Sequence, residues 1–271
     1  MFALELTCAQ NQRDRLIAEL WEWGTAGVIE RDDGVTAYFE QRVDPRALVE
    51  AFREFAPRIA EVPDSDWVAS ARQSWEPLPV GRRFFLVAEW RADPTPSGRL
   101  RLEMRPRQAC GTGLHPATRL CLELLEDHLR PGSVVLDVGT GSGLLAAAAA
   151  LLGAGRVLAC DIEQQAVLEA GDRFRSEHLH VDLFLGSLRS VRSRSAHLIL
   201  LNIHAEAVLV LAPELARVLV PGGGAIVSGF RRRDLHRVQA ALKAVGLQTT
   251  EMREQEGWLA LVCYTPSYAP P

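Results

Sequence analysis

The chain has 271 residues, which is longer than most single compact domains, so two domains are expected. Apolar residues make up 48% of the chain and charged residues 24%, a balance that supports a sizeable core and excludes global disorder. The formal net charge is −4 with both signs interspersed, which gives no support for a dominant nucleic-acid-binding surface, since such a surface needs a basic stripe.

The first 62 residues predict a small α+β domain. An Asp-Asp-Gly turn at residues 32–34 separates two apolar runs and indicates a β-hairpin. Asp44 and Pro45 are typical of the N-cap and the first position of a helix. The expected elements are a strand over residues 2–7, a helix over 11–23, strands over 26–30 and 35–40, a helix from 45, and a strand over 59–62. This β-α-β-β-α-β order favours a ferredoxin-like fold.

Residues 63–107 predict a linker region that prolines interrupt repeatedly. A short helix is expected over residues 66–75, and strands are expected over 84–90 and 100–104. The second domain is expected to comprise residues 108–271.

In this second domain, helical and strand patterns alternate. Residues 133–138 are mostly apolar, which is typical of a parallel strand covered on both faces. Expected strands lie at residues 133–138, 156–160, 181–185, 197–201, 225–228, 247–253 and 258–264. Expected helices lie at residues 118–129, 143–152, 167–174, 205–219 and 235–245. A Pro-Gly-Gly turn is expected at residues 221–223. The alternation predicts an α/β, doubly wound, Rossmann-like sheet.

The cysteines and the N-terminus bear on the compartment. The five cysteines are scattered and form no C-x-x-C pair, which favours reduced thiols and predicts neither a disulfide framework nor a metal site. Residues 1–6 lack the basic flank and long apolar core of a signal peptide. The longest apolar stretch, residues 144–152, is too short to span a bilayer. We therefore expect a cytoplasmic protein with no membrane contact.

The clearest chemical signal is a glycine-rich turn, which reads Leu-Asp-Val-Gly-Thr-Gly-Ser-Gly over residues 136–143. Glycines let the backbone approach a ligand closely, and the following helix offers free N–H groups. The turn also fits a loose dinucleotide fingerprint, so a nicotinamide oxidoreductase is an alternative. The Gly139-x-Gly141 spacing and the late Pro-Gly-Gly favour S-adenosyl-L-methionine. So does Asp137, whose carboxylate can receive the donor's ammonium, directly or through water.

Two further polar residues follow predicted parallel strands. Asp161 ends the second strand, where a carboxylate can accept hydrogen bonds from both ribose hydroxyls; the alternative is a helix N-cap. Asn202 follows the fourth strand and is expected to face the methionine end of the donor, with a helix cap as its alternative. His204 is a candidate base, although a lone loop histidine is more often solvated.

Several motifs together resemble one family, the PrmA-type ribosomal protein methyltransferases. These motifs are Gly-Thr-Gly-Leu-His-Pro-Ala-Thr at residues 111–118, the glycine turn, Asp-Ile at 161–162, Asn-Ile at 202–203, Leu-Ala-Pro-Glu-Leu at 211–215 and Glu-Gly-Trp at 256–258. The chain departs from the family pattern at Cys110, where Phe is usual, and at Ala117, where Thr is usual.

The resemblance implies a function and a set of site residues. It implies that the enzyme trimethylates lysine and N-terminal amino groups of protein eleven of the large ribosomal subunit, which residues 1–62 would recognise. It implies that Thr118, Gly139, Asp161 and Asn202 bind the donor, and the glycine spacing adds Gly141. No catalytic base is evident. The alternatives are a methyltransferase of the same fold acting on another protein or a small amine, and a non-catalytic module that binds the donor.

Overall fold

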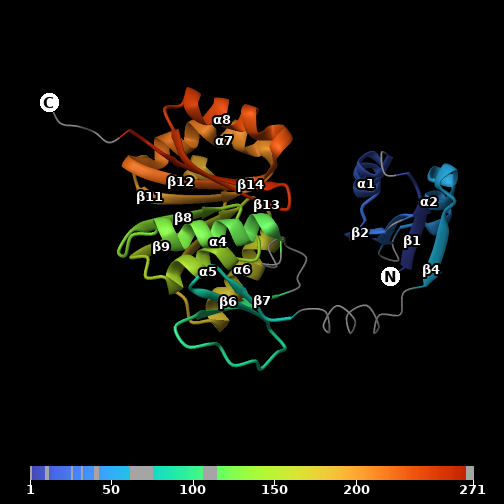
Figure 1. Ribbon diagram of the computed structural model, residues 1–271, viewed down its shortest axis with the longest axis horizontal. Helices are drawn as coiled ribbons and strands as arrows, with labels where there is room; N and C mark the ends of the chain where they lie inside the picture. The colour runs from blue at the N-terminus through green and yellow to red at the C-terminus, as the bar shows by residue number, and fades with distance from the viewer. Residues whose placement is uncertain are drawn as a thin grey trace. The chain divides into compact units, whose positions relative to one another are not determined.

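The computed structural model describes residues 2–9, 12–25, 27–31, 33–39, 43–61, 76–105 and 115–266 (Figure 1). The chain divides into two compact units, Met1–Trp75 and Glu76–Pro271. The helix expected over residues 66–75 lies outside the described residues, as do Cys110 and residues 111–114 of the Gly-Thr-Gly motif.

The first unit is a four-stranded antiparallel sheet with two helices. Its elements are β1 (Phe2–Thr7), α1 (Arg13–Glu22), β2 (Gly27–Arg31), β3 (Gly34–Phe39), α2 (Pro45–Ala51), the 3-10 turn η2 (Arg53–Phe55) and β4 (Arg58–Glu61). The strand order is β2-β3-β1-β4, which together with the β-α-β-β-α-β sequence confirms the ferredoxin-like prediction. Asp44 caps α2 by accepting a hydrogen bond from the Arg46 N–H at 2.9 Å, as its position before Pro45 predicted.

The first unit has its own hydrophobic core. Alternate residues of β1 and β3 point to the same face, where Leu4, Leu6 and Phe39 are fully buried. Leu16 and Leu20, one helical turn apart on α1, pack into the same cluster.

The second unit begins with a small three-stranded sheet and continues as a larger one. The small sheet is formed by β5 (Leu78–Val80), β6 (Phe84–Ala88) and β7 (Leu100–Met104). The later elements are α4 (Pro116–His128), β8 (Val134–Val138), α5 (Leu144–Leu151), β9 (Arg156–Asp161), α6 (Gln164–Ser176), β10 (Val181–Leu185), η3 (Leu188–Ser190), β11 (Ala196–Asn202), α7 (Ala205–Val218), β12 (Leu219–Arg231), η4 (Arg232–Asp234), α8 (Leu235–Ala244), β13 (Gln248–Gln255) and β14 (Trp258–Tyr264).

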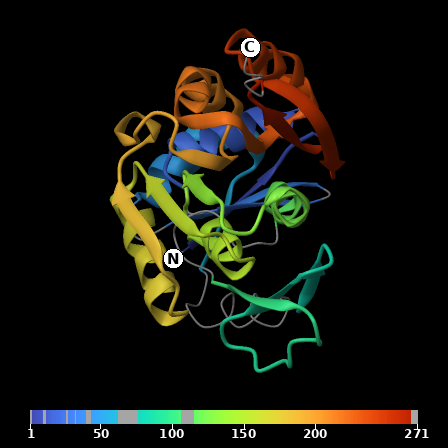
Figure 2. The same ribbon diagram turned by 90° about the vertical axis from the view of Figure 1, so that its left-hand side faces the viewer.

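The larger sheet has the order β10-β9-β8-β11-β12-β14-β13. Its first five strands are parallel and β14 is antiparallel to both of its neighbours. Figure 1 shows α4, α5 and α6 on one side of this sheet and α7 and α8 on the other, and Figure 2 shows its strands side by side. The doubly wound prediction is therefore confirmed. The chain order reverses between β8 and β11, and such a switch point is where open α/β sheets bind ligands.

Two strands differ from the prediction. The strand β5 was not predicted, because three residues that include Pro79 carry little periodicity. The turn predicted at residues 221–223 is wrong as a strand boundary, since β12 runs from Leu219 to Arg231. Between the pairs Ala196–Leu219 and Leu198–Gly224, β11 advances two residues and β12 five, so the Pro-Gly-Gly segment is a turn-like irregularity within one strand, where Gly222 has a φ of +73°.

None of the helices that the structure describes has the length and apolar character that a membrane span requires.

Candidate functional site

The glycine turn lies where β8 ends and α5 begins, at the carboxyl edge of the sheet. Gly139, Gly141 and Gly143 have φ values of +69°, +54° and +77°, which side chains with a Cβ rarely adopt. A Cβ at Gly139 would lie 2.7 Å from Cγ2 of Ile203, which follows β11. Position 139 thus requires glycine for two reasons: its φ is positive, and a Cβ would collide with the side chain of Ile203.

Asp161 joins this turn to the end of β9. One carboxylate oxygen accepts a hydrogen bond from the Gly141 N–H at 2.9 Å, and the other accepts one from the Glu163 N–H at 3.1 Å. The N-cap of α6 is Glu163, so the N-cap alternative for Asp161 is wrong. Only 9% of Asp161 is exposed. A carboxylate has about four acceptor positions, so two remain for a ligand's hydroxyl groups.

Thr118 and Asn202 meet although they are far apart in the sequence. Asn202 is the last residue of β11, and its Nδ2 donates to the Thr118 hydroxyl in the first turn of α4 at 3.2 Å. Thr118 is buried, with 3% of its surface exposed, and Asn202 is partly buried. The pair lies beside β8, because Leu201 of β11 pairs with Val138.

The helix caps near this pair are histidines. His115 caps α4, because its Nδ1 accepts from the Ala117 N–H at 3.2 Å, so Thr118 is not the N-cap. His204 caps α7 by accepting from the Ala207 N–H at 3.3 Å, which excludes the capping alternative for Asn202. The His204 side chain is 72% exposed and lies 3.5 Å from Glu206. These contacts give His204 a structural role that the base hypothesis had not considered.

Asp137 differs from its expected role. It is 1% exposed, and its Oδ2 accepts hydrogen bonds from the Thr140 hydroxyl at 2.7 Å and the Ala146 N–H at 3.1 Å. Burial raises the pKa of this carboxyl to about 6, against the opposing effect of both hydrogen bonds. This burial disfavours direct receipt of a ligand's ammonium, whereas receipt through a water molecule stays a prediction. Asp137 instead binds the glycine turn and the start of α5 from the buried side.

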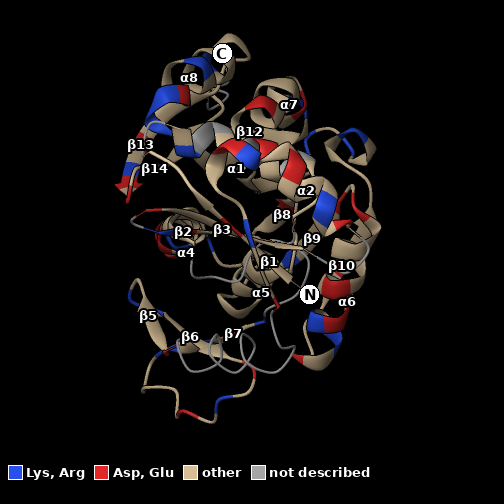
Figure 3. Ribbon diagram, turned by 90° about the vertical axis from the view of Figure 1, so that its right-hand side faces the viewer, with Lys and Arg blue, Asp and Glu red and all other residues tan. Residues whose placement is uncertain are grey.

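Arg173 also holds the turn, a role that was not predicted from the sequence. Its side chain is fully buried, donates from Nε to the Ser142 carbonyl at 2.7 Å, and pairs with Glu177 at 2.8 Å. Figure 3 shows charged residues of both signs along α6, a pattern typical of a solvated helix face. The phase of the apolar residues on α6 was the available signal, since Arg173 follows Ala166 and Ala170 at helical spacing.

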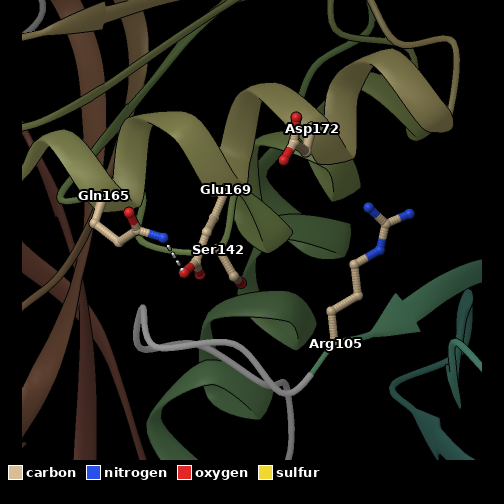
Figure 4. Close-up of a pocket in the computed structure, with 5 residues that line it drawn as sticks. All are labelled: Arg105, Ser142, Gln165, Glu169 and Asp172. Carbon is tan, nitrogen blue, oxygen red and sulfur yellow. Dashed lines mark hydrogen bonds between the residues drawn. The ribbon is translucent and has the colours of Figure 1, made fainter.

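A polar cavity of about 280 Å³ adjoins the turn on the α6 side. It is lined by Arg105, Ser142, Gln165, Glu169 and Asp172, and Figure 4 shows α6 supplying three of these side chains. Its lining includes none of Thr118, Asp161 and Asn202. We therefore do not assign the expected donor to this cavity.

Replacing Arg173 with methionine is expected to destabilise the protein by about 1–3 kcal/mol, because the buried Ser142 carbonyl would lose its partner while Glu177 would keep its ion pair with Arg105 at 3.1 Å. Arg175→Met on the same helix is the control: its side chain is 74% exposed, so its pairing with Asp172 is expected to contribute about 0.5 kcal/mol or less. Urea unfolding of both variants checks the difference. Equal losses would contradict a supporting role for Arg173.

Asp137 is expected to make stability depend on pH. The folded carboxyl titrates at about 6 and the ordinary value is 3.8, so the folded state alone holds the proton between them. Stability therefore falls as pH rises through this window, by roughly 3 kcal/mol at most. Unfolding measured from about pH 4 to about pH 7 should show this fall relative to Asp137→Asn, which cannot ionise. Parallel pH profiles would show that Asp137 does not titrate there.

Comparison with known proteins identifies the family. A family model described as "Ribosomal protein L11 methyltransferase (PrmA)" matches residues 3–265. The chain is 41% identical over 202 residues to a ribosomal protein L11 methyltransferase of Pelotomaculum thermopropionicum, covering 74% of this chain and 66% of that protein. It is 37% identical over 234 residues to one from Cupriavidus taiwanensis, covering 84% of this chain and 77% of that protein.

A solved structure agrees with these matches. The crystal structure of a ribosomal protein L11 methylase from Lactobacillus delbrueckii subsp. bulgaricus superposes with a TM-score of 0.66 at 30% identity, covering 71% of this chain and 100% of that one. The predicted methyltransferase fold and the predicted resemblance are therefore confirmed. The chain belongs to the PrmA family of ribosomal protein L11 methyltransferases, an enzyme family whose expected cofactor is S-adenosyl-L-methionine.

Proposed function

We propose that this chain transfers methyl groups from S-adenosyl-L-methionine to lysine and N-terminal amino groups of ribosomal protein L11. Membership of the PrmA family and the names of the relatives support the reaction and the substrate. The observation that carries the proposal is the meeting of three strand ends, those of β8, β9 and β11, around the glycine turn. The five residues proposed to bind the donor are Thr118, Gly139, Gly141, Asp161 and Asn202.

The chemistry of these residues fits the donor. Asp161 has acceptor positions left for the ribose hydroxyls after it binds Gly141, and the glycine turn has no Cβ at Gly139 to obstruct a close approach. Thr118 and Asn202 form a polar pair on the other side of β8 from Asp161, where they suit the amino-acid end of the donor. S-adenosyl-L-methionine supplies an electrophilic methyl group when it is bound.

The protein's part in the reaction is to position the acceptor amine beside the donor's methyl group and to exclude water from it. A lysine amine has an ordinary pKa of about 10.4 and must lose its proton before it can attack. Desolvation beside a positive charge lowers the pKa of that amine, so no strong base is required. Positioning then supplies much of the rate enhancement. This agrees with the exposed position of His204 as a helix cap rather than a buried base.

The first unit is the proposed recognition domain for the protein substrate. Its separate hydrophobic core and ferredoxin-like sheet support a domain over residues 1–62. The linker predicted for residues 63–107 overlaps the second compact unit, which begins at Glu76 with the three-stranded sheet. A substrate that is a ribosomal protein places the proposed reaction in the cytoplasm.

The direct test is methyl transfer from radiolabelled donor into purified ribosomal protein L11, with other ribosomal proteins assayed in parallel. Label in L11 amino groups is expected. Label confined to another protein would replace the substrate and keep the enzyme class. Donor binding without transfer to any protein of a cell extract would indicate a binding module instead.

Asp161→Asn is expected to weaken donor binding about 10- to 100-fold, because a hydrogen bond to a charged group contributes about 1.5–3 kcal/mol. Asp182→Asn is the matched control. Asp182 lies near the start of β10, whereas Leu185 at the end of β10 pairs with Asp161, and Asp182 forms an ion pair with Arg156 on the surface. Calorimetric titration with S-adenosylhomocysteine measures both. Unchanged affinity in Asp161→Asn would refute the role proposed for this carboxylate.

A further inference from the structure

Two segments with no role in the proposed chemistry meet beside the Thr118–Asn202 pair. These are His115, which precedes α4, and Trp258, which begins β14. Their rings meet edge to face with centroids 4.3 Å apart and an interplanar angle of 71°. The Arg231 guanidinium lies over the Trp258 ring, 4.8 Å from its centroid. Such contacts stabilise a pair of side chains beyond what burial alone provides.

His115 holds the first turn of α4 through three backbone N–H groups. Its Nδ1 accepts from Ala117, and its carbonyl accepts from Thr118 at 3.0 Å and Arg119 at 3.1 Å. Helix N-termini leave such groups without partners inside the helix, so the position of this turn depends on its cap. Thr118 therefore depends on how His115 is held.

The strand that carries Trp258 also contacts the Asn202 side of the pair. The next residue, Leu259, accepts a hydrogen bond at its carbonyl from the Ser228 hydroxyl at 2.7 Å. Ser228 is fully buried and pairs with Asn202 across β11 and β12. The start of β14 is thus linked to Thr118 by the contact of Trp258 with His115, and to Asn202 by the hydrogen bond of Leu259 with Ser228.

We propose that Trp258 and His115 are positioning residues for the donor site, which set the first turn of α4 so that Thr118 meets Asn202. The inference rests on the proposed function, because it assumes that this pair binds S-adenosyl-L-methionine. It gives a role to the Glu-Gly-Trp and His-Pro motifs, which the resemblance had left without one.

The cap also makes the site sensitive to acid. Nδ1 of His115 can accept a hydrogen bond only while the imidazole is neutral. Burial, followed by the nearby Arg231 and Arg119, lowers the pKa of His115, and Glu256, which pairs with Arg119, opposes this effect. The lowered pKa keeps the cap intact at neutral pH. The contribution of the cap to stability is lost as pH falls below the ordinary histidine value of 6.5 toward the lowered one.

The test compares the affinity of the full chain for S-adenosylhomocysteine among variants at position 258. Trp258→Leu is expected to weaken binding about tenfold, whereas Trp258→Phe keeps an aromatic edge and should stay within about threefold. Trp23→Leu, in the first unit, is the control and should bind as the wild type does. If Thr118→Val already weakens binding, adding Trp258→Leu should weaken it little further, because both changes act on one contact.

A second arm uses pH. Wild-type affinity should decline on acidification more than that of His115→Asn, whose amide can cap the helix at any pH. Independent, multiplicative effects of Thr118→Val and Trp258→Leu, or identical pH profiles for wild type and His115→Asn, would overturn the positioning role. Failure of the wild type to bind S-adenosylhomocysteine would instead refute the proposed function, so the two failures are distinguishable.

Discussion

The hydrogen bond from the Gly141 N–H to the Asp161 carboxylate is the constraint on which the rest of the site depends. It joins the turn after β8 to the end of β9, and so fixes one conformation of a segment that glycine leaves free. Because β8 lies between β9 and β11, Asp161 and Asn202 lie on opposite sides of this turn. The pairing of β8 with its two neighbours places these two polar groups, which are proposed to hold opposite ends of the donor.

Buried charge supports this turn from the interior. Asp137 binds the turn and the start of α5, and Arg173 binds the Ser142 carbonyl from α6. Burying such groups is costly, and their hydrogen bonds to the turn and the ion pair of Arg173 with Glu177 offset part of that cost. This arrangement suits a binding site, because ligand groups then meet a surface that does not have to reorganise.

The sequence predicted the larger features because they rest on local patterns. Alternating helix and strand periodicity was sufficient for the doubly wound sheet, and the glycine spacing located the turn correctly between β8 and α5. The same periodicity could not show that the turn at Pro221-Gly222-Gly223 lies within β12, because strand pairing on either side of it is a non-local property. The short strand β5 carried too few residues for any period to show.

The tertiary contacts of the site could not be predicted from the sequence, because they are non-local as well. Thr118 and Asn202 are 84 residues apart, and no spacing rule joins them. Asp137 read as a ligand contact because its place before the glycines says nothing about burial, which α5 determines. Arg173 was not singled out in the sequence, although its spacing from Ala166 and Ala170 on α6 is consistent with the inward orientation that the structure shows.

The most direct measurement is a crystal structure of the chain with S-adenosylhomocysteine. The account predicts both ribose hydroxyls within about 3.2 Å of the Asp161 carboxylate while the Gly141 N–H still donates to it. It would be contradicted by a sugar bound away from Asp161, for example in the polar cavity beside α6, or by a glycine turn that releases Asp161 when the ligand binds.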